Sequence, residues 1–136
     1  MIHPSSVQIA ARIEDLYGAP LNELEAHIQD QPPGMLAALL GGHHTLAMAE
    51  QSIIFHRERL QQLVHPERQM GVHEVSHILD CARRLAEAVA VRDTQSTTTQ
   101  AVLQSLVRTP APETPSGPAP APAAVPAPAV PAAPSR

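Results

Sequence analysis

The chain is almost free of aromatic residues, with one Phe, one Tyr and no Trp among its 136 residues. Its core must therefore be assembled from Leu, Ile, Val, Met and Ala. Side chains of this kind pack well between helices, whereas strands are enriched in aromatic and β-branched residues. The composition predicts an all-α fold, either a small helical bundle or an array of helical hairpins.

Residues 109–136 consist almost entirely of Pro, Ala, Val, Ser and Thr, and ten of the fifteen prolines lie there. Such a segment cannot bury enough apolar surface to offset the conformational entropy that is lost on folding. We therefore expect an α-helical domain at residues 1–108, followed by a disordered Pro/Ala-rich tail at residues 109–136.

Helix-start and helix-stop signals divide residues 1–108 into about five helices. The expected helices cover residues 5–17, 20–31, 45–64, 72–92 and 97–108, with an apolar helical turn or two at residues 34–42. Gly41-Gly42 is expected to break the chain before the longest helix. The polar stretch TQSTTTQ, residues 94–100, is expected to separate the last two helices.

The predicted helix at residues 45–64 is apolar on two faces. One face is a narrow seam with alternating spacings of three and four residues, formed by Leu46, Ala49, Ile53, Leu60 and Leu63. Met48 and Phe55 lie on nearly the opposite side. Such a helix is either central in a bundle or offers a surface to another chain.

A broad apolar face is also expected on the helix at residues 72–92. Its members are Val75, Ile78, Leu79, Ala82, Leu85, Ala86 and Val89. The last helix is amphipathic as well. The predicted interaction surface comprises Met48, Phe55, Val102, Leu103, Leu106 and Val107.

The stretch HEVSH resembles the His-Glu-x-x-His motif of zinc peptidases. The resemblance implies that His73 and His77 would bind zinc and that Glu74 would act as a base toward the bound water. No third ligand follows at a spacing typical of that family. The alternative is a solvated helix stripe, because His73, His77, Asp80 and Arg84 fall on one side. On that interpretation the protein needs no cofactor.

Two other histidine positions stand out. His43-His44 follows the Gly-Gly pair and is expected in a solvent-facing loop. His56 falls in the seam between Ile53 and Leu60. It is either a core histidine with one hydrogen bond or a pH switch, since protonation near an ordinary pKa of about 6.5 would place a charge between helices.

Charge and composition limit the function classes. The formal net charge of −4 and the scarcity of aromatics argue against nucleic-acid binding. The N-terminal sequence has neither a cationic start nor a continuous apolar run, and no stretch is apolar enough for a membrane span. We expect a cytoplasmic protein, with signal-independent export left open. The single cysteine, Cys81, is expected to be a small core residue.

Residues 65–108 resemble the C-terminal half of inner-rod subunits of bacterial type III secretion systems. The resemblance rests on Pro66, the amphipathic helix through Leu79, and the final sequence TTQAVLQSLVR. It implies a non-enzymatic assembly component whose last helix packs against neighbouring subunits. The Pro/Ala-rich tail departs from that pattern.

The sequence therefore favours a non-enzymatic helical interaction or assembly protein that associates with itself or with another protein. No small-molecule substrate is indicated. A minimal zinc hydrolase and a histidine-based metal- or pH-responsive module remain the alternatives.

Overall fold

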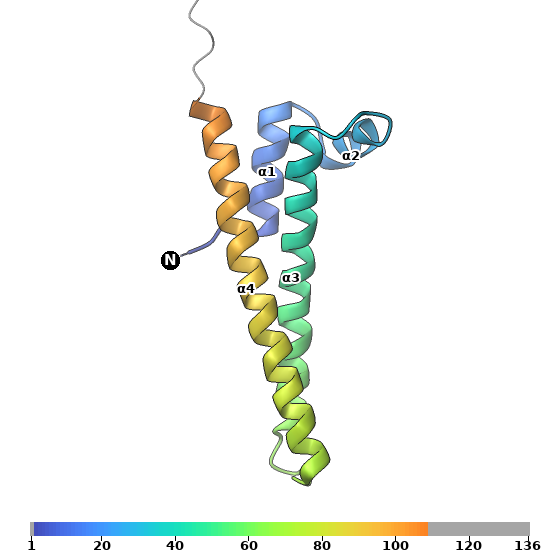
Figure 1. The fold of residues 1–136 in the computed structure, drawn as a ribbon, viewed down its shortest axis with the longest axis vertical. Helices are drawn as coiled ribbons and strands as arrows, with labels where there is room; N and C mark the ends of the chain where they lie inside the picture. Colours follow the sequence, from blue (N-terminus) through green and yellow to red (C-terminus); the bar gives the residue numbers. More distant parts are fainter. Residues whose placement is uncertain (1, 109–136) are drawn as a thin grey trace, which may run out of the picture.

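The computed structural model describes residues 2–108, and the predicted tail lies outside these described residues. Within them the chain forms four helices and no strand (Figure 1). These are α1 (Ser6–Tyr17), α2 (Leu21–Gln29), α3 (Met35–Leu63) and α4 (Val72–Arg108). The all-α prediction is confirmed, whereas the expected number of five helices is wrong.

The long helices α3 and α4 lie side by side as an antiparallel hairpin. Helix α1 lies along the upper half of this hairpin in Figure 1 and contacts both long helices, while α2 turns away at the upper end. The upper half therefore contains three helices. Among residues 2–108, the lower half contains only α3 and α4.

The inner side of α3 follows the predicted seam. Leu46, Ala49, Ile53 and Leu63 are buried, and His56 and Leu60 are half-buried. Spacings of alternately three and four residues keep this side turned toward one partner helix over the full length of α3. The sequence pattern thus accounts for the pairing of α3 with α4.

Gly41-Gly42 does not interrupt the helix, so residues 35–42 form the start of α3, and His43 and His44 lie within it. The reason lies in the packing against α4. A Cβ atom added at Gly42 would lie 2.6 Å from the Thr99 hydroxyl oxygen, whereas one at Gly41 would meet nothing within 4 Å. Gly42 therefore permits a close approach of the two long helices, which offsets its low intrinsic helix propensity.

Residues 94–100 also continue a helix that was expected to end. Ser96 and Thr99 are buried in this part of α4, and Thr99 faces Gly42. The Ser96 hydroxyl donates a hydrogen bond of 2.7 Å to the carbonyl of Pro4. Neighbouring segments pack close to the axis of α4 here, and small polar side chains leave room for them.

Helix α1 has a well-defined start and end. Ser5 and Gln8 form a capping box at its start, and Gly18 ends it in the left-handed conformation, with φ of 70°. Ile9 and Ile13, one turn apart, are fully buried against the hairpin. The core that they join is confined to the upper half and includes Leu24, Leu39, Leu40, Leu46 and Leu103.

The N-terminal end of α1 is fixed by polar contacts with both long helices. The Glu50 carboxylate of α3 accepts hydrogen bonds from the backbone N–H of Ser6, at 2.8 Å, and from the Ser6 hydroxyl. On α4, Thr97 lies 3.3 Å from the His3 ring and Asp93 lies 3.8 Å from it. The third helix therefore begins at the level of Glu50 and Ser96.

Substitutions at the adjacent glycines should have opposite effects. Gly41→Ala should raise the free energy of unfolding by about 0.5–1 kcal/mol, because alanine favours the helix and meets no neighbour. Gly42→Ala should instead lower it by about 1–3 kcal/mol through overpacking against Thr99. Urea unfolding followed by circular dichroism measures both.

Thr99→Ala provides the matched control. Combined with Gly42→Ala, it should recover much of the lost stability, since the hydroxyl oxygen that obstructs the new methyl group is gone. Equal effects of the two glycine substitutions would show that the close approach does not govern the pairing of α3 and α4.

Candidate functional site

We call the part of the hairpin beyond the start of α1, residues 51–63 and 72–90, the free half. On one side of it a small open groove of about 190 Å³ lies between the two helices. Its lining residues are Phe55, His56, Arg59 and Leu63 from α3, and His77, Asp80, Cys81 and Arg84 from α4. The groove thus unites Phe55, predicted for protein contact, with His56 and His77.

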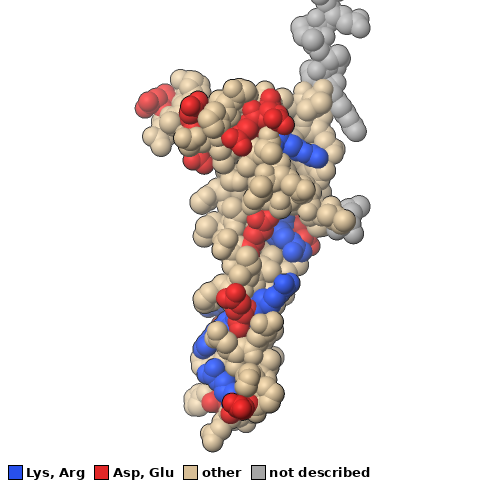
Figure 2. Space-filling view, turned by 180° about the vertical axis from the view of Figure 1, so that it is seen from behind, with Lys and Arg blue, Asp and Glu red and all other residues tan. Residues whose placement is uncertain are grey.

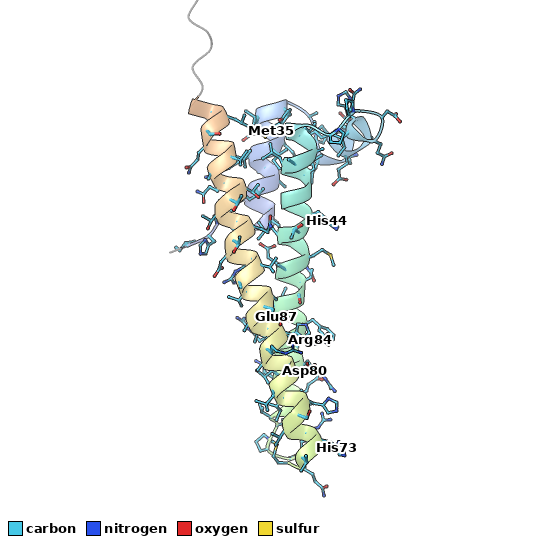
Figure 3. All side chains as sticks on the ribbon, viewed as in Figure 1. Met35, His44, His73, Asp80, Arg84 and Glu87 are labelled. Atoms are coloured by element: carbon cyan, nitrogen blue, oxygen red, sulfur yellow. The ribbon has the colours of Figure 1, made fainter. Side chains whose placement is uncertain are left out.

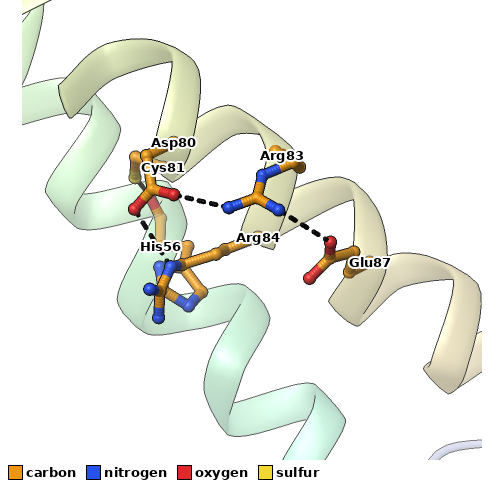
Figure 4. A network of polar contacts seen from close by, with 6 residues as sticks. All are labelled: His56, Asp80, Cys81, Arg83, Arg84 and Glu87. Atoms are coloured by element: carbon orange, nitrogen blue, oxygen red, sulfur yellow. Dashed lines mark hydrogen bonds and ion pairs between the residues drawn. The ribbon is translucent and has the colours of Figure 1, made fainter. Parts of the chain in front are cut away.

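An ion-pair network borders this groove on α4 (Figure 4). Asp80 accepts hydrogen bonds from Arg83, at 2.8 Å, and from Arg84, at 3.0 Å, and Arg83 lies 3.8 Å from Glu87. The hydrogen bond from Arg83 lowers the pKa of Asp80 and in turn raises the pKa of Arg83. Asp80 therefore remains an anion bound to two cations and has no proton to donate at neutral pH.

His56 lies where the groove meets the seam. Its ring packs edge-to-face with Phe55, with ring centroids 5.1 Å apart. Its backbone carbonyl accepts a hydrogen bond of 3.2 Å from the buried Cys81 thiol of α4. The charged or titratable groups that border the groove with it are Arg59, His77, Asp80, Cys81 and Arg84. The pH switch at His56 stays a prediction.

The His-Glu-x-x-His stretch lies at the first turns of α4, at the tip of the hairpin (Figure 3). His73 and His77 are exposed. The Glu74 carboxylate turns back and accepts a hydrogen bond of 3.0 Å from the N–H of Gly71, just before the helix. Glu74 thus stabilises the start of α4, as a glutamate in the first turn commonly does.

The electrostatics of Glu74 suit this capping role. Hydrogen bonding to its own backbone N–H and to that of Gly71 lowers the pKa of Glu74, and nearby His73 and Arg68 act in the same direction. A lower pKa makes a carboxylate a weaker base. Among residues 2–108, no three His, Cys, Asp or Glu side chains are grouped so that they could hold a metal ion. The residues present therefore do not fit a catalytic zinc site.

The residues predicted for protein contact fall into two groups. Met48 and Phe55 are exposed, with 62% of Phe55 accessible, and Val107 is 73% exposed near the end of α4. Leu103 is only 3% exposed, and Val102 and Leu106 pack against the same upper core. These three residues hold α4 within its own chain, which leaves Val107 as the exposed member of the set on the last helix.

The broad apolar face expected on residues 72–92 is divided in the structure. Ile78 and Leu85 are half-buried and alternate along the helix with the buried Cys81 and Ala88, whereas Leu79 is 65% exposed and Val75 is also exposed. The exposed positions, together with the half-buried Val89, form a second row with alternating three- and four-residue spacing, which we call the outer stripe. It consists of Val72, Val75, Leu79, Ala82, Ala86 and Val89.

The remaining surface offers few clues of other kinds. On the face shown in Figure 2, acidic side chains gather toward the upper end, whereas acidic and basic side chains are interspersed along the lower part. Within the described range, no helix combines the length and the apolar character that crossing a bilayer requires. Comparisons of the chain with protein families, with curated proteins and with solved structures find no match.

The capping role of Glu74 predicts a pH-dependent effect of Glu74→Gln, which removes the charge and keeps the shape. The variant should have a lower melting temperature than the parent at pH 7. Because the folded-state pKa lies below the ordinary value of 4.5, the carboxylate stabilises the fold above that value, and this stabilisation is lost as the pH falls through the folded-state pKa. The difference in melting temperature between the parent and the variant should therefore disappear at acidic pH.

Thermal unfolding followed by circular dichroism between pH 7 and pH 3 tests this. Glu87→Gln, farther along the same helix, is a control for removing an exposed carboxylate outside the first turn. A Glu74→Gln gap that stays constant across the range would contradict the capping role.

Proposed function

We propose that this protein is a non-enzymatic helical interaction or assembly protein that binds another protein chain through the free half of its hairpin. The observation that carries the proposal is the absence of a third helix there among residues 2–108, combined with exposed large apolar side chains. Ile54, Phe55, Val75 and Leu79 are each more than two-fifths exposed. Apolar surface gathered in this way is typical of contact sites.

The contrast between the two halves supports this assignment. In the upper half, Ile9 and Ile13 of α1 cover the hairpin and are fully buried. In the free half, one seam between two helices is the main source of burial, and apolar residues remain exposed on both sides of it. Burying such residues against a further helix is favourable, at about 25 cal/mol per Å² of apolar surface.

A secretion-system role extends this proposal. The resemblance of residues 65–108 to type III inner-rod subunits is the support for it, and most of that segment is α4. Such subunits assemble through helices, and the exposed Phe55, Leu79 and Val107 are suited to contacts of that kind. The expected cytoplasmic location, with signal-independent export left open, belongs to this extended proposal.

We do not propose a zinc hydrolase. Glu74 caps α4, and the exposed pair His73 and His77 lacks a third ligand among the described residues. An exposed His-x-x-x-His pair can bind transition metals without any catalytic role.

Site-specific photo-crosslinking in the cells that make the protein tests the proposed function. A photoreactive amino acid at Phe55 or Leu79 should give covalent adducts with another protein chain, because both positions are exposed on the free half. The same amino acid at Ala11, exposed on α1, is the matched control. Adducts at neither Phe55 nor Leu79, or equal adducts at all three positions, would contradict the proposal.

A further inference from the structure

The outer stripe continues the surface on which the N-terminal segment lies. In a helix that packs along its length, residues seven apart face the same neighbour. On α4, Ser96 contacts Pro4 and Asp93 lies close to His3. Counting back in sevens from these two positions gives, in turn, Val89, Ala82 and Val75, and Ala86, Leu79 and Val72. These six residues are the outer stripe.

The same rule applies on α3. Glu50 binds the first residue of α1, and the next turn on this side carries Ile54, which is 51% exposed. Arg57 follows seven residues after Glu50 and is also exposed. The side of the hairpin that holds α1 in the upper half therefore continues in the free half as an apolar face between α3 and α4, which no other segment of residues 2–108 covers.

The charge on this face changes between the two halves. At Glu50 the carboxylate receives N–H and O–H groups from the start of α1. At the equivalent position in the free half stands the guanidinium of Arg57, which forms no ion pair with the residues that the structure describes. A helix bound at this face would therefore pair best with Arg57 if it carried a carboxylate opposite the guanidinium.

A second copy of the chain fits this face poorly. Cys81 contacts the carbonyl of His56, so Arg57 lies near the middle of the outer stripe. Antiparallel pairing about a two-fold axis would bring the Arg57 side chains of both copies close together, with like-charge repulsion. If the two copies were parallel, both α1 helices would lie on the paired face at the same end, and they would meet each other there.

We infer that the free half binds an amphipathic helix of a different protein on this face. The bound helix has apolar residues at alternating three- and four-residue spacing, which lie on the outer stripe, and an Asp or Glu that meets Arg57. This inference rests on the proposed function and specifies the partner's chemistry. The outer stripe spans 18 residues of α4, or about 25 Å at the rise of an α-helix.

Designed peptides provide the probe. One is an 18-residue helix with leucines at heptad spacing and glutamates along one flank, and its sister has lysines in place of the glutamates. By fluorescence anisotropy with the full chain, the glutamate peptide should bind at least tenfold more tightly. Leu79→Ser should weaken binding at least tenfold, because it places a hydroxyl in the centre of the stripe.

Charge reversal separates this face from the groove on the other side. Arg57→Glu should reverse the preference in favour of the lysine peptide. Arg59→Glu, which changes an arginine that lines the groove around His56, is the matched control and should leave the preference unchanged. Both substitutions are at exposed positions, and circular dichroism verifies that the variants are folded.

Three outcomes would overturn the inference. They are the absence of peptide binding, a preference unaffected by Arg57→Glu, and self-association of the parent that Leu79→Ser abolishes in sedimentation velocity. The last would identify a second copy as the occupant. If crosslinks still form at Leu79 in cells, the inference about the acidic helix fails while the proposed interaction function stands.

Discussion

The close approach of α3 and α4 at Gly42 and Thr99 determines how the rest of the molecule is arranged. Because Gly42 has no side chain, α4 can pass near the α3 backbone at this level, and both helices continue without a break. Two uninterrupted helices of 29 and 37 residues then form a hairpin much longer than α1. The free half is a direct consequence of this mismatch in length.

Helix α1 divides the hairpin into parts with different physical properties. Its two isoleucines complete a three-helix core, and Glu50, Asp93, Ser96 and Thr97 bind the segment that leads into it. Beyond that point the hairpin relies on one seam and on surface ion pairs, which contribute little when exposed. The apolar outer stripe faces water among residues 2–108, so covering it with another helix would stabilise the free half.

The sequence predicted the helical class and the α3 seam because regular spacing reports directly on which side of a helix is buried. It did not predict the continuity of α3 and α4. Gly42 and the polar residues near Ser96 have low helix propensity in isolation, and only contacts with distant segments explain their helical state. Local helix propensity therefore predicted helix breaks at the positions where the structure instead packs distant segments closely together.

The candidate site shows a similar division. Exposure of Phe55 followed from its position opposite the seam. On α4, two apolar rows overlap, and the sequence alone could not show which row faces α3; the buried row includes Cys81 and Ala88. The capping role of Glu74 could have been found, since a glutamate three residues after Gly71 at a helix start is a known capping pattern.

Hydrogen exchange measured by mass spectrometry tests the central claim, that among residues 2–108 the hairpin has an upper half covered by α1 and a free half that no helix covers. In the isolated chain, backbone amides of residues 51–63 and 72–90 should exchange faster than those of residues 39–49 and 95–106, because fewer apolar contacts oppose local opening. Bound partner helix should slow exchange mainly in the free half. Uniform protection along both helices of the isolated chain would contradict the account.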